Sequence, residues 1–242
     1  MNKKKILIFS GAGLDAESGI ETFRSGDNGG LWSTYKVEEV ASIGGWRKDK
    51  KKVLDFYNLR RREMKTVCPN KAHELIADLE KYFDVVNITQ NVSNLLERAG
   101  SANVIHLHGE LSKSRSTFDD QLIYDVEGDL NIGDLCPQGS QLRPNIVFFE
   151  EMLDKGNLMA SKRIASEADV CIIVGSSMQV SPANSIPFLT PETALIYYVD
   201  PGEFNIHISD YRKAFFYHIK EVATVGMEKV HKELLEIFKI DV

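Results

Sequence analysis

Six short runs of apolar residues, separated by segments with helical periodicity, most constrain what this chain can fold into. Parallel strands covered on both faces appear in a sequence as such runs. They occupy residues 6–9, 85–88, 104–107, 146–149, 170–174 and 195–199. Amphipathic helical patterns lie over residues 49–67, 69–83 and 226–240. The alternation predicts an α/β fold: a Rossmann-like, doubly wound parallel sheet.

Two segments do not follow this alternation. Residues 26–52 are rich in glycine and polar residues, and residues 112–141 lack a strong period. The sequence therefore predicts a smaller inserted domain beside the main one. We expect residues 1–36, 68–111 and 142–242 in the larger domain, and residues 37–67 and 112–141 in the smaller one.

The composition excludes several classes of protein. The net charge of −6 and the lack of a basic stripe argue against a nucleic-acid surface. Cys68, Cys136 and Cys171 form neither a disulfide framework nor a four-cysteine metal site, because they are odd in number and far apart. No run is long enough for a membrane span or a signal peptide. We expect a cytoplasmic protein, acting as a monomer.

A glycine motif follows the first apolar run. Gly11, Ala12, Gly13 and Ala16 match the G-x-G-x-x-G/A pattern that lets a dinucleotide pyrophosphate approach the backbone. On its own the match fits a simple glycine turn equally well. The string continues as ESGIETFRS over residues 17–25 and GLW over residues 30–32, which is far more specific.

In this stretch the chain resembles the sirtuin family of NAD-dependent protein lysine deacylases. The resemblance continues in TQN at 89–91, HLHGEL at 106–111, LRPNIVFF at 142–149 and VGSSMQVSP at 174–182, in the order of the family. It implies NAD as the cofactor and acylated lysine side chains of proteins as the substrate. It also implies that the acyl group passes to ADP-ribose with release of nicotinamide.

The resemblance assigns roles to individual residues. The general base is His108, because the family's base directly precedes a glycine, whereas His106 is structural; histidine suits this role because its pKa lies near working pH. Asn91 is the second catalytic residue. The cofactor-binding residues implied are Gly11, Ala12, Gly13, Ala16, Phe23, Arg24, Gln90, Asn91, Ser93, Gly175, Ser176, Ser177 and Asp200.

A tyrosine and an arginine indicate the acyl group. Tyr57 and Arg60 are three residues apart on a predicted helix, so their phenol and guanidinium share a face and could together bind a carboxylate. The stretch resembles class III sirtuins, whose Tyr-x-x-Arg pair selects succinyl, malonyl or glutaryl lysine. The alternative is a solvated basic face, which we expect for Arg61 and Arg62. The family holds the substrate backbone between residues 147–151 and 177–180, here through Val147, Phe149, Glu150, Met178 and Val180.

The chain departs from the family at several positions. The family usually has two cysteine pairs in the small domain, but this region holds only Cys136, with Ser116 where a ligand is expected. One thiolate cannot form a structural zinc site, so we predict no metal. Ser93 replaces an Asp that contacts nicotinamide, and Glu150 replaces a Gly beside the substrate. Asp15 adds an acid near the pyrophosphate, which is unfavourable unless it faces away or caps the helix.

The leading prediction is an NAD-dependent protein-lysine deacylase, chiefly a desuccinylase and demalonylase and a weaker deacetylase. The replacements Ser93 and Glu150 motivate an alternative, an NAD glycohydrolase or ADP-ribosyltransferase using the same NAD site. A third possibility is a module that binds NAD or ADP-ribose without turnover.

Overall fold

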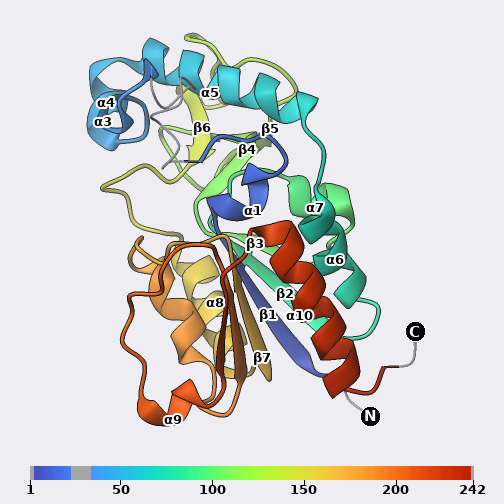
Figure 1. Cartoon of the computed structure of the whole chain (residues 1–242). Coiled ribbons are helices and arrows are strands. Elements are labelled where there is room, and N and C mark those ends of the chain that lie inside the picture. Colours follow the sequence, from blue (N-terminus) through green and yellow to red (C-terminus); the bar gives the residue numbers. More distant parts are fainter. Residues whose placement is uncertain (1–2, 23–33, 241–242) are drawn as a thin grey trace.

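A six-stranded parallel sheet forms the larger body of the molecule (Figure 1). The computed structural model describes residues 3–22 and 34–240. The strands are β1 (Lys5–Ser10), β2 (Asp84–Thr89), β3 (Val104–His106), β7 (Val170–Val174), β8 (Leu195–Val199) and β9 (Phe216–Ile219). Their order is β3-β2-β1-β7-β8-β9. This is the doubly wound order of a Rossmann sheet, so the predicted fold class is confirmed.

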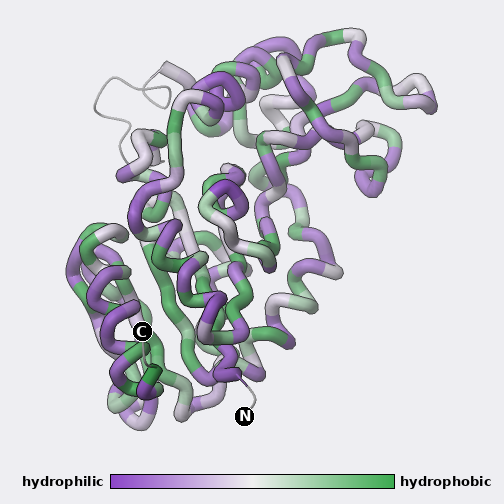
Figure 2. Tube along the Cα trace, turned by 90° about the vertical axis from the view of Figure 1, so that its right-hand side faces the viewer, coloured by the Kyte–Doolittle hydropathy of each residue, from purple (hydrophilic) through white to green (hydrophobic). Residues whose placement is uncertain are grey.

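Helices cover both faces of this sheet. One face packs against α6 (Lys71–Leu79) and α10 (Ala223–Ile237), and the other against α8 (Lys155–Ser166) and the 3-10 helix η2 (Ala183–Leu189). Successive side chains of a strand point to opposite faces, so Ile6 and Ile8 enter one core while Leu7 and Phe9 enter the other. Figure 2 shows hydrophobic segments running through the larger body, in the lower part of the view.

The predicted helices form where capping residues allow them. The Asp49 side chain accepts a hydrogen bond from the Lys52 amide and starts α5 (Lys50–Thr66). Asn70 caps α6 in a capping box with His73. The third predicted helix is α10, which begins three residues earlier than expected. Short helices of the larger body include α1 (Ala12–Ala16), α7 (Leu95–Ala99) and α9 (Asp210–Lys213).

A second, antiparallel sheet lies above the first in Figure 1. It contains β4 (Gly109–Ser116), β5 (Ile123–Asp125) and β6 (Leu142–Ile146), with β4 in the middle. Its core is closed by α5 together with α3 (Val37–Val40) and α4 (Ile43–Lys48), whose buried residues pack on Leu111 and Phe148. The described residues thus form a smaller sheet beside the main one, while the exact domain boundaries stay a prediction.

One strand prediction needs correction, and one strand was not predicted. Residues 146–149 were expected to form a strand of the main sheet, but Ile146 ends β6 of the small sheet and the rest of the run leaves it. An apolar run indicates that residues are buried, but not which strand lies beside them. Here the Val147 amide donates to the carbonyl oxygen of His108. The edge strand β9 was not anticipated, because its residues are only partly buried. Within the described ranges, no helix combines the length and apolarity needed to cross a bilayer.

Candidate active site

The candidate site lies where the order of the main sheet reverses. β1 and β7 are neighbours, and their chain connections leave in opposite directions. At such a switch point, ligands bind outside the carboxyl ends of the strands. The loops at this edge carry Gly11 after β1, residues 89–91 after β2 and Gly175 after β7. The sequence-predicted cofactor residues of these three loops are therefore brought together.

Glycines allow the loops after β1 and β7 to interlock. The Gly13 amide donates to the carbonyl oxygen of Gly175 at 2.8 Å. A Cβ on Gly13 would lie 2.7 Å from Gly175 Cα, and a Cβ on Gly175, whose φ is +60°, would lie 2.2 Å from the Leu14 nitrogen. Larger residues would separate the two loops. Ala12 is half-buried and Ala16 is exposed in the same turn. The glycine motif is thus required to build the loop pair itself.

Two amide side chains connect the strand ends. The Ser176 hydroxyl donates to Gln90 Oε1 at 2.9 Å, which joins the loops after β7 and β2. Asn91 Nδ2 donates to the carbonyl oxygen of Gly11 at 3.0 Å, which joins the loops after β2 and β1. Ser93 is buried and Ser177 is half-buried nearby in sequence. Phe23 and Arg24 lie outside the described residues.

The two histidines at the end of β3 differ in chemistry. His106 faces the Asn91 carbonyl oxygen through Nδ1 and Glu97 Oε1 through Nε2, at 3.0 and 2.7 Å. Both partners accept hydrogen bonds, so both ring nitrogens of His106 donate. Burial alone would lower the pKa of His106, but the hydrogen bond and charge of Glu97 outweigh it and raise the pKa. The two contacts fix the His106 ring, and the raised pKa favours its protonated form.

His108 has the opposite character. Its Nδ1 lies 3.1 Å from the carbonyl oxygen of Gln90, which can only accept, so Nδ1 carries the proton. Burial lowers the pKa of His108 although the hydrogen bond to Gln90 opposes the shift. The neutral ring therefore presents the lone pair of Nε2. A basic nitrogen with a fixed tautomer is what proton abstraction requires.

Gly109 explains why a glycine must follow this histidine. Its φ is +84°, and a Cβ there would lie 1.9 Å from the carbonyl oxygen of Asn145. At this residue β4 passes directly against β6. The pairing places His108 at the junction of the two sheets.

Asp15 faces away from the phosphate loop. The carboxylate is buried, and its Oδ1 lies 3.1 Å from Nε2 of His73 on α6. The backbone amide of Asn70 donates to His73 Nδ1, so Nε2 carries a proton and donates to Asp15. This acid therefore attaches α1 to α6, which removes the conflict with a pyrophosphate that the sequence raises.

Asp200 lies at the end of β8, and one of its carboxylate oxygens accepts the Gly202 amide at 2.8 Å. It thus acts as a turn residue before Gly202. The carboxylate keeps further acceptor sites on both oxygens, which a ribose hydroxyl could use.

The expected substrate segments lie at the junction of the sheets. Phe149 pairs on one side with residues 41–43, donating to the Ala41 carbonyl oxygen at 2.8 Å, and is half-exposed. Glu150 is exposed and has a φ of +74°, a conformation that glycine, its counterpart in the family, adopts more easily. In the other segment Met178 is buried and Val180 is exposed.

Sequence reasoning missed Glu151, which fixes the turn after these residues. Its carboxylate accepts from Arg143 Nη2 at 3.0 Å, from Arg115 at 2.9 Å and from the Phe148 amide at 2.8 Å. Burial would raise the pKa of Glu151, but Arg143 holds it below the ordinary value. A charged pair flanking an apolar run, Arg143 and Glu151, was the available signal.

The acyl-selecting candidates lie on α5. The Tyr57 ring stacks on Phe148 at 5.8 Å between centroids. Burial raises the pKa of Tyr57, and the nearby charge of Arg60 opposes the rise. The Arg60 guanidinium pairs with Glu63 at 3.0 Å, and only 10% of the Arg60 side chain is exposed. Tyr57 and Arg60 thus share a buried face of the helix.

Of the two arginines expected to be solvated, only Arg62 is. It is exposed and pairs with Asp129. The expectation for Arg61 is wrong, because this side chain is buried and donates to the Leu111 carbonyl oxygen and to Asn58. Burial lowers the pKa of Arg61 to about 10. The Arg61 side chain points inward, where α5 packs against β4, and donates a hydrogen bond to the β4 backbone.

The residues do not fit the structural zinc of the family. The Ser116 hydroxyl donates to Cys136 Sγ at 3.3 Å, so a hydrogen bond links the end of β4 to the loop between β5 and β6. Among the described residues, no group of three or more His, Cys, Asp and Glu side chains is placed to hold a metal ion. One thiol and one hydroxyl fall short of four zinc ligands.

We expect a chelator such as EDTA to leave the unfolding midpoint unchanged within about 1 °C, because the described residues offer no set of ligands that could hold a structural metal. Differential scanning fluorimetry measures this midpoint, and metal analysis of the purified protein is the control. One bound zinc per chain, removed by the chelator with loss of stability, would contradict the prediction.

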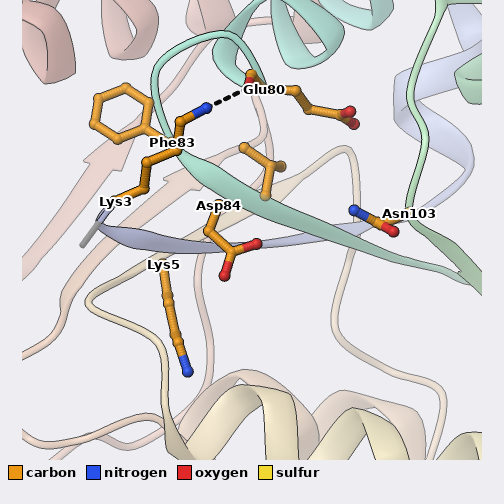
Figure 3. Close-up of a pocket in the computed structure, with 7 residues that line it drawn as sticks. Lys3, Lys5, Glu80, Phe83, Asp84 and Asn103 are labelled. Carbon is orange, nitrogen blue, oxygen red and sulfur yellow. Dashed lines mark hydrogen bonds between the residues drawn. The ribbon is translucent and has the colours of Figure 1, made fainter. Parts of the chain in front are cut away.

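A hollow at the other end of the sheet is unrelated to this site. It has a volume of about 460 Å³ and includes Lys3, Lys5, Glu80 and Asp84 (Figure 3). Lys3 Nζ closes one side by donating to the Glu80 carbonyl oxygen at 3.1 Å. These residues lie at the amino ends of β1 and β2, opposite the loops described above.

A parallel sheet with its convergent polar groups at the switch point defines a nucleotide-binding α/β protein. The family is more specific: a model described as the Sir2 family matches residues 11–182, and the chain belongs to this family. It is 47% identical to the NAD-dependent protein deacylase of Helicobacter pylori, over 97% of this chain and 99% of that protein.

Solved structures of Sir2 proteins share the fold of this chain. A Sir2 homologue in complex with NAD superposes with a TM-score of 0.84 at 37% identity, covering 97% of this chain and 91% of that one. A Sir2 protein with a deacetylated p53 peptide and an acetyl ADP-ribose superposes with a TM-score of 0.76 at 28% identity, covering 96% and 94%.

Proposed function

We propose that this protein is an NAD-dependent protein-lysine deacylase that prefers acidic acyl groups and removes acetyl groups more slowly. The observation that carries the proposal is the state of His108, whose protonated Nδ1 and lowered pKa leave a basic Nε2 at the junction of the sheets. The family and the name of the Helicobacter pylori relative support the reaction class.

The residues of this chain would position the reactants. When bound, NAD supplies the ADP-ribosyl group that accepts the acyl chain and the nicotinamide that leaves. His108 Nε2 would take a proton from a ribose hydroxyl. Gln90 and Asn91, already fixed by Ser176 and Gly11, hold the nicotinamide ribose in place, so the groups meet without further ordering.

The acidic preference rests on Tyr57 and Arg60. Tyr57 stacks on Phe148, and the adjacent Val147 donates to the His108 carbonyl oxygen at 2.9 Å, so a short chain of contacts joins the pair to the base. A buried guanidinium beside a phenol offers charge-assisted and neutral hydrogen bonds to a carboxylate. An acetyl group carries no charge that Arg60 could bind.

The substrate backbone would bind along residues 147–151. Phe149 uses its amide and carbonyl toward residues 41–43, so the opposite edge belongs to Phe148 and Glu150. The Phe148 amide is taken by Glu151. Glu150 has a φ of +74° and lies in the turn that the Glu151 amide closes on the Phe148 carbonyl oxygen, so it borders the added strand, and its exposed carboxylate favours basic peptides.

The test uses succinyl-lysine and acetyl-lysine peptides of one sequence, with NAD, and follows all products by mass spectrometry. We expect faster succinyl removal, with succinyl ADP-ribose formed. We expect Arg60→Met to lower kcat/KM for the succinyl peptide by roughly 10- to 100-fold, the loss of a charge-assisted contact, with little change for the acetyl peptide.

Arg62→Met is the matched control, because Arg62 lies on the same helix but is exposed and paired with Asp129. Equal loss of both activities in Arg60→Met would contradict the acidic preference. Nicotinamide and ADP-ribose released at the same rate without peptide would instead indicate an NAD glycohydrolase.

A further inference from the structure

The Arg60 guanidinium already has a carboxylate beside it. Glu63, one turn further along α5, places Oε2 at 3.0 Å from Arg60 Nη1. Only 10% of the Arg60 side chain and 28% of the Glu63 side chain are exposed. A pair with the same spacing on α6 is far more open: in the pair of Lys71 and Glu74, more than half of each side chain is exposed.

Burial gives this pair more weight than a surface ion pair. Water and salt screen exposed charges, whereas a partly buried pair is screened much less. An acyl carboxylate arriving at Arg60 would therefore meet the negative charge of Glu63 at close range. The guanidinium has donors for more than one carboxylate, but the two anions repel each other.

We infer that Glu63 is a specificity-determining residue, whose carboxylate competes with an acidic acyl group for Arg60 and so limits the preference for succinyl over acetyl lysine. The inference rests on the proposed function. An acetyl group neither needs Arg60 nor approaches Glu63 with a charge, so deacetylation is insensitive to the competition. The Arg60 and Glu63 pair thereby keeps the site open to both kinds of substrate.

Glu63→Gln tests this competition, because glutamine keeps the size and a hydrogen-bonding oxygen but has no charge. We expect KM for the succinyl peptide to fall about threefold or more at unchanged kcat, and the acetyl parameters to stay within about twofold. Glu63→Ala should act in the same direction. Glu74→Gln, in the exposed pair on α6, is the matched control and should change neither substrate.

A double-mutant cycle with Arg60→Met separates the possible results. If Glu63 acts through Arg60, the effect of Glu63→Gln disappears in the Arg60→Met background. A higher succinyl KM in Glu63→Gln would mean that Glu63 orients Arg60 for the substrate, and it would overturn the inference. An unchanged succinyl KM in folded Glu63→Gln and Glu63→Ala would overturn it as well.

Failure of the proposed function looks different. In that case Arg60→Met reduces both activities equally, whatever Glu63→Gln does, and the inference falls with the proposal. If Arg60→Met removes only the succinyl activity while Glu63→Gln has no effect, the proposed function stands and only the role of Glu63 is overturned.

Discussion

Replacing His108 by asparagine is expected to lower kcat for deacylation by about 100- to 10,000-fold, the usual contribution of a positioned general base. Asparagine can still donate to the Gln90 carbonyl oxygen, which His108 Nδ1 contacts at 3.1 Å, but it has no basic nitrogen. Asparagine thereby keeps the contact to the loop after β2, which carries Gln90. NAD affinity, measured by calorimetry, should therefore change little.

The pH dependence of kcat/KM provides a second test of His108. Because burial lowers the pKa of His108 below its usual 6.5, kcat/KM should rise with pH and reach its plateau already near neutrality. This acid limb should be missing from the residual activity of the asparagine variant. His207→Asn, at an exposed loop position, is the control and should keep rate and pH profile. Retention of more than about a tenth of the activity in His108→Asn would exclude His108 as the base.

Gly109→Ala is expected to have the largest effect on stability. The added Cβ would lie 1.9 Å from the Asn145 carbonyl oxygen, and alanine would have to adopt a φ of +84°. Strand β4 must then move away from β6, or the backbone must flip. We expect a loss of about 3 kcal/mol or more in the free energy of unfolding, from strain and lost strand pairing together.

Urea denaturation measures this loss, and Gly128→Ala is the matched control. Gly128 has no atom within 4 Å of an added Cβ, so alanine should be tolerated there. If Gly109→Ala unfolds at the same urea concentration as Gly128→Ala, the close approach of β4 and β6 is not what requires the glycine.

The main sheet could be predicted because its signals are local. Five of the six apolar runs are strands of that sheet, since a buried parallel strand needs an uninterrupted apolar stretch wherever it lies. The sixth run, at 146–149, carried the same signal and was assigned to the wrong sheet. Its partner is residue 108 and the neighbouring β4, and no property of the run itself names that partner.

The same limit applies to charged residues. Arg61 and Arg62 are adjacent and look alike in the sequence, yet one is buried against the Leu111 carbonyl oxygen and the other is exposed. From the sequence, the charge of Asp15 is expected to repel a pyrophosphate. In the structure its carboxylate contacts His73, on a helix distant in the sequence. In both cases the direction of a side chain depends on an element far away in the sequence.

The sequence by itself determined the fold class, the glycine loop, the histidine followed by glycine and the family resemblance, because each is carried by residues close together in the chain. Only the tertiary structure decided which tautomer His108 adopts, where Asp15 points and that Glu63 shares Arg60. These features depend on which carbonyls, imidazoles and carboxylates meet when loops and helices pack. The periodicity of a local stretch of sequence does not indicate which of these groups will be in contact.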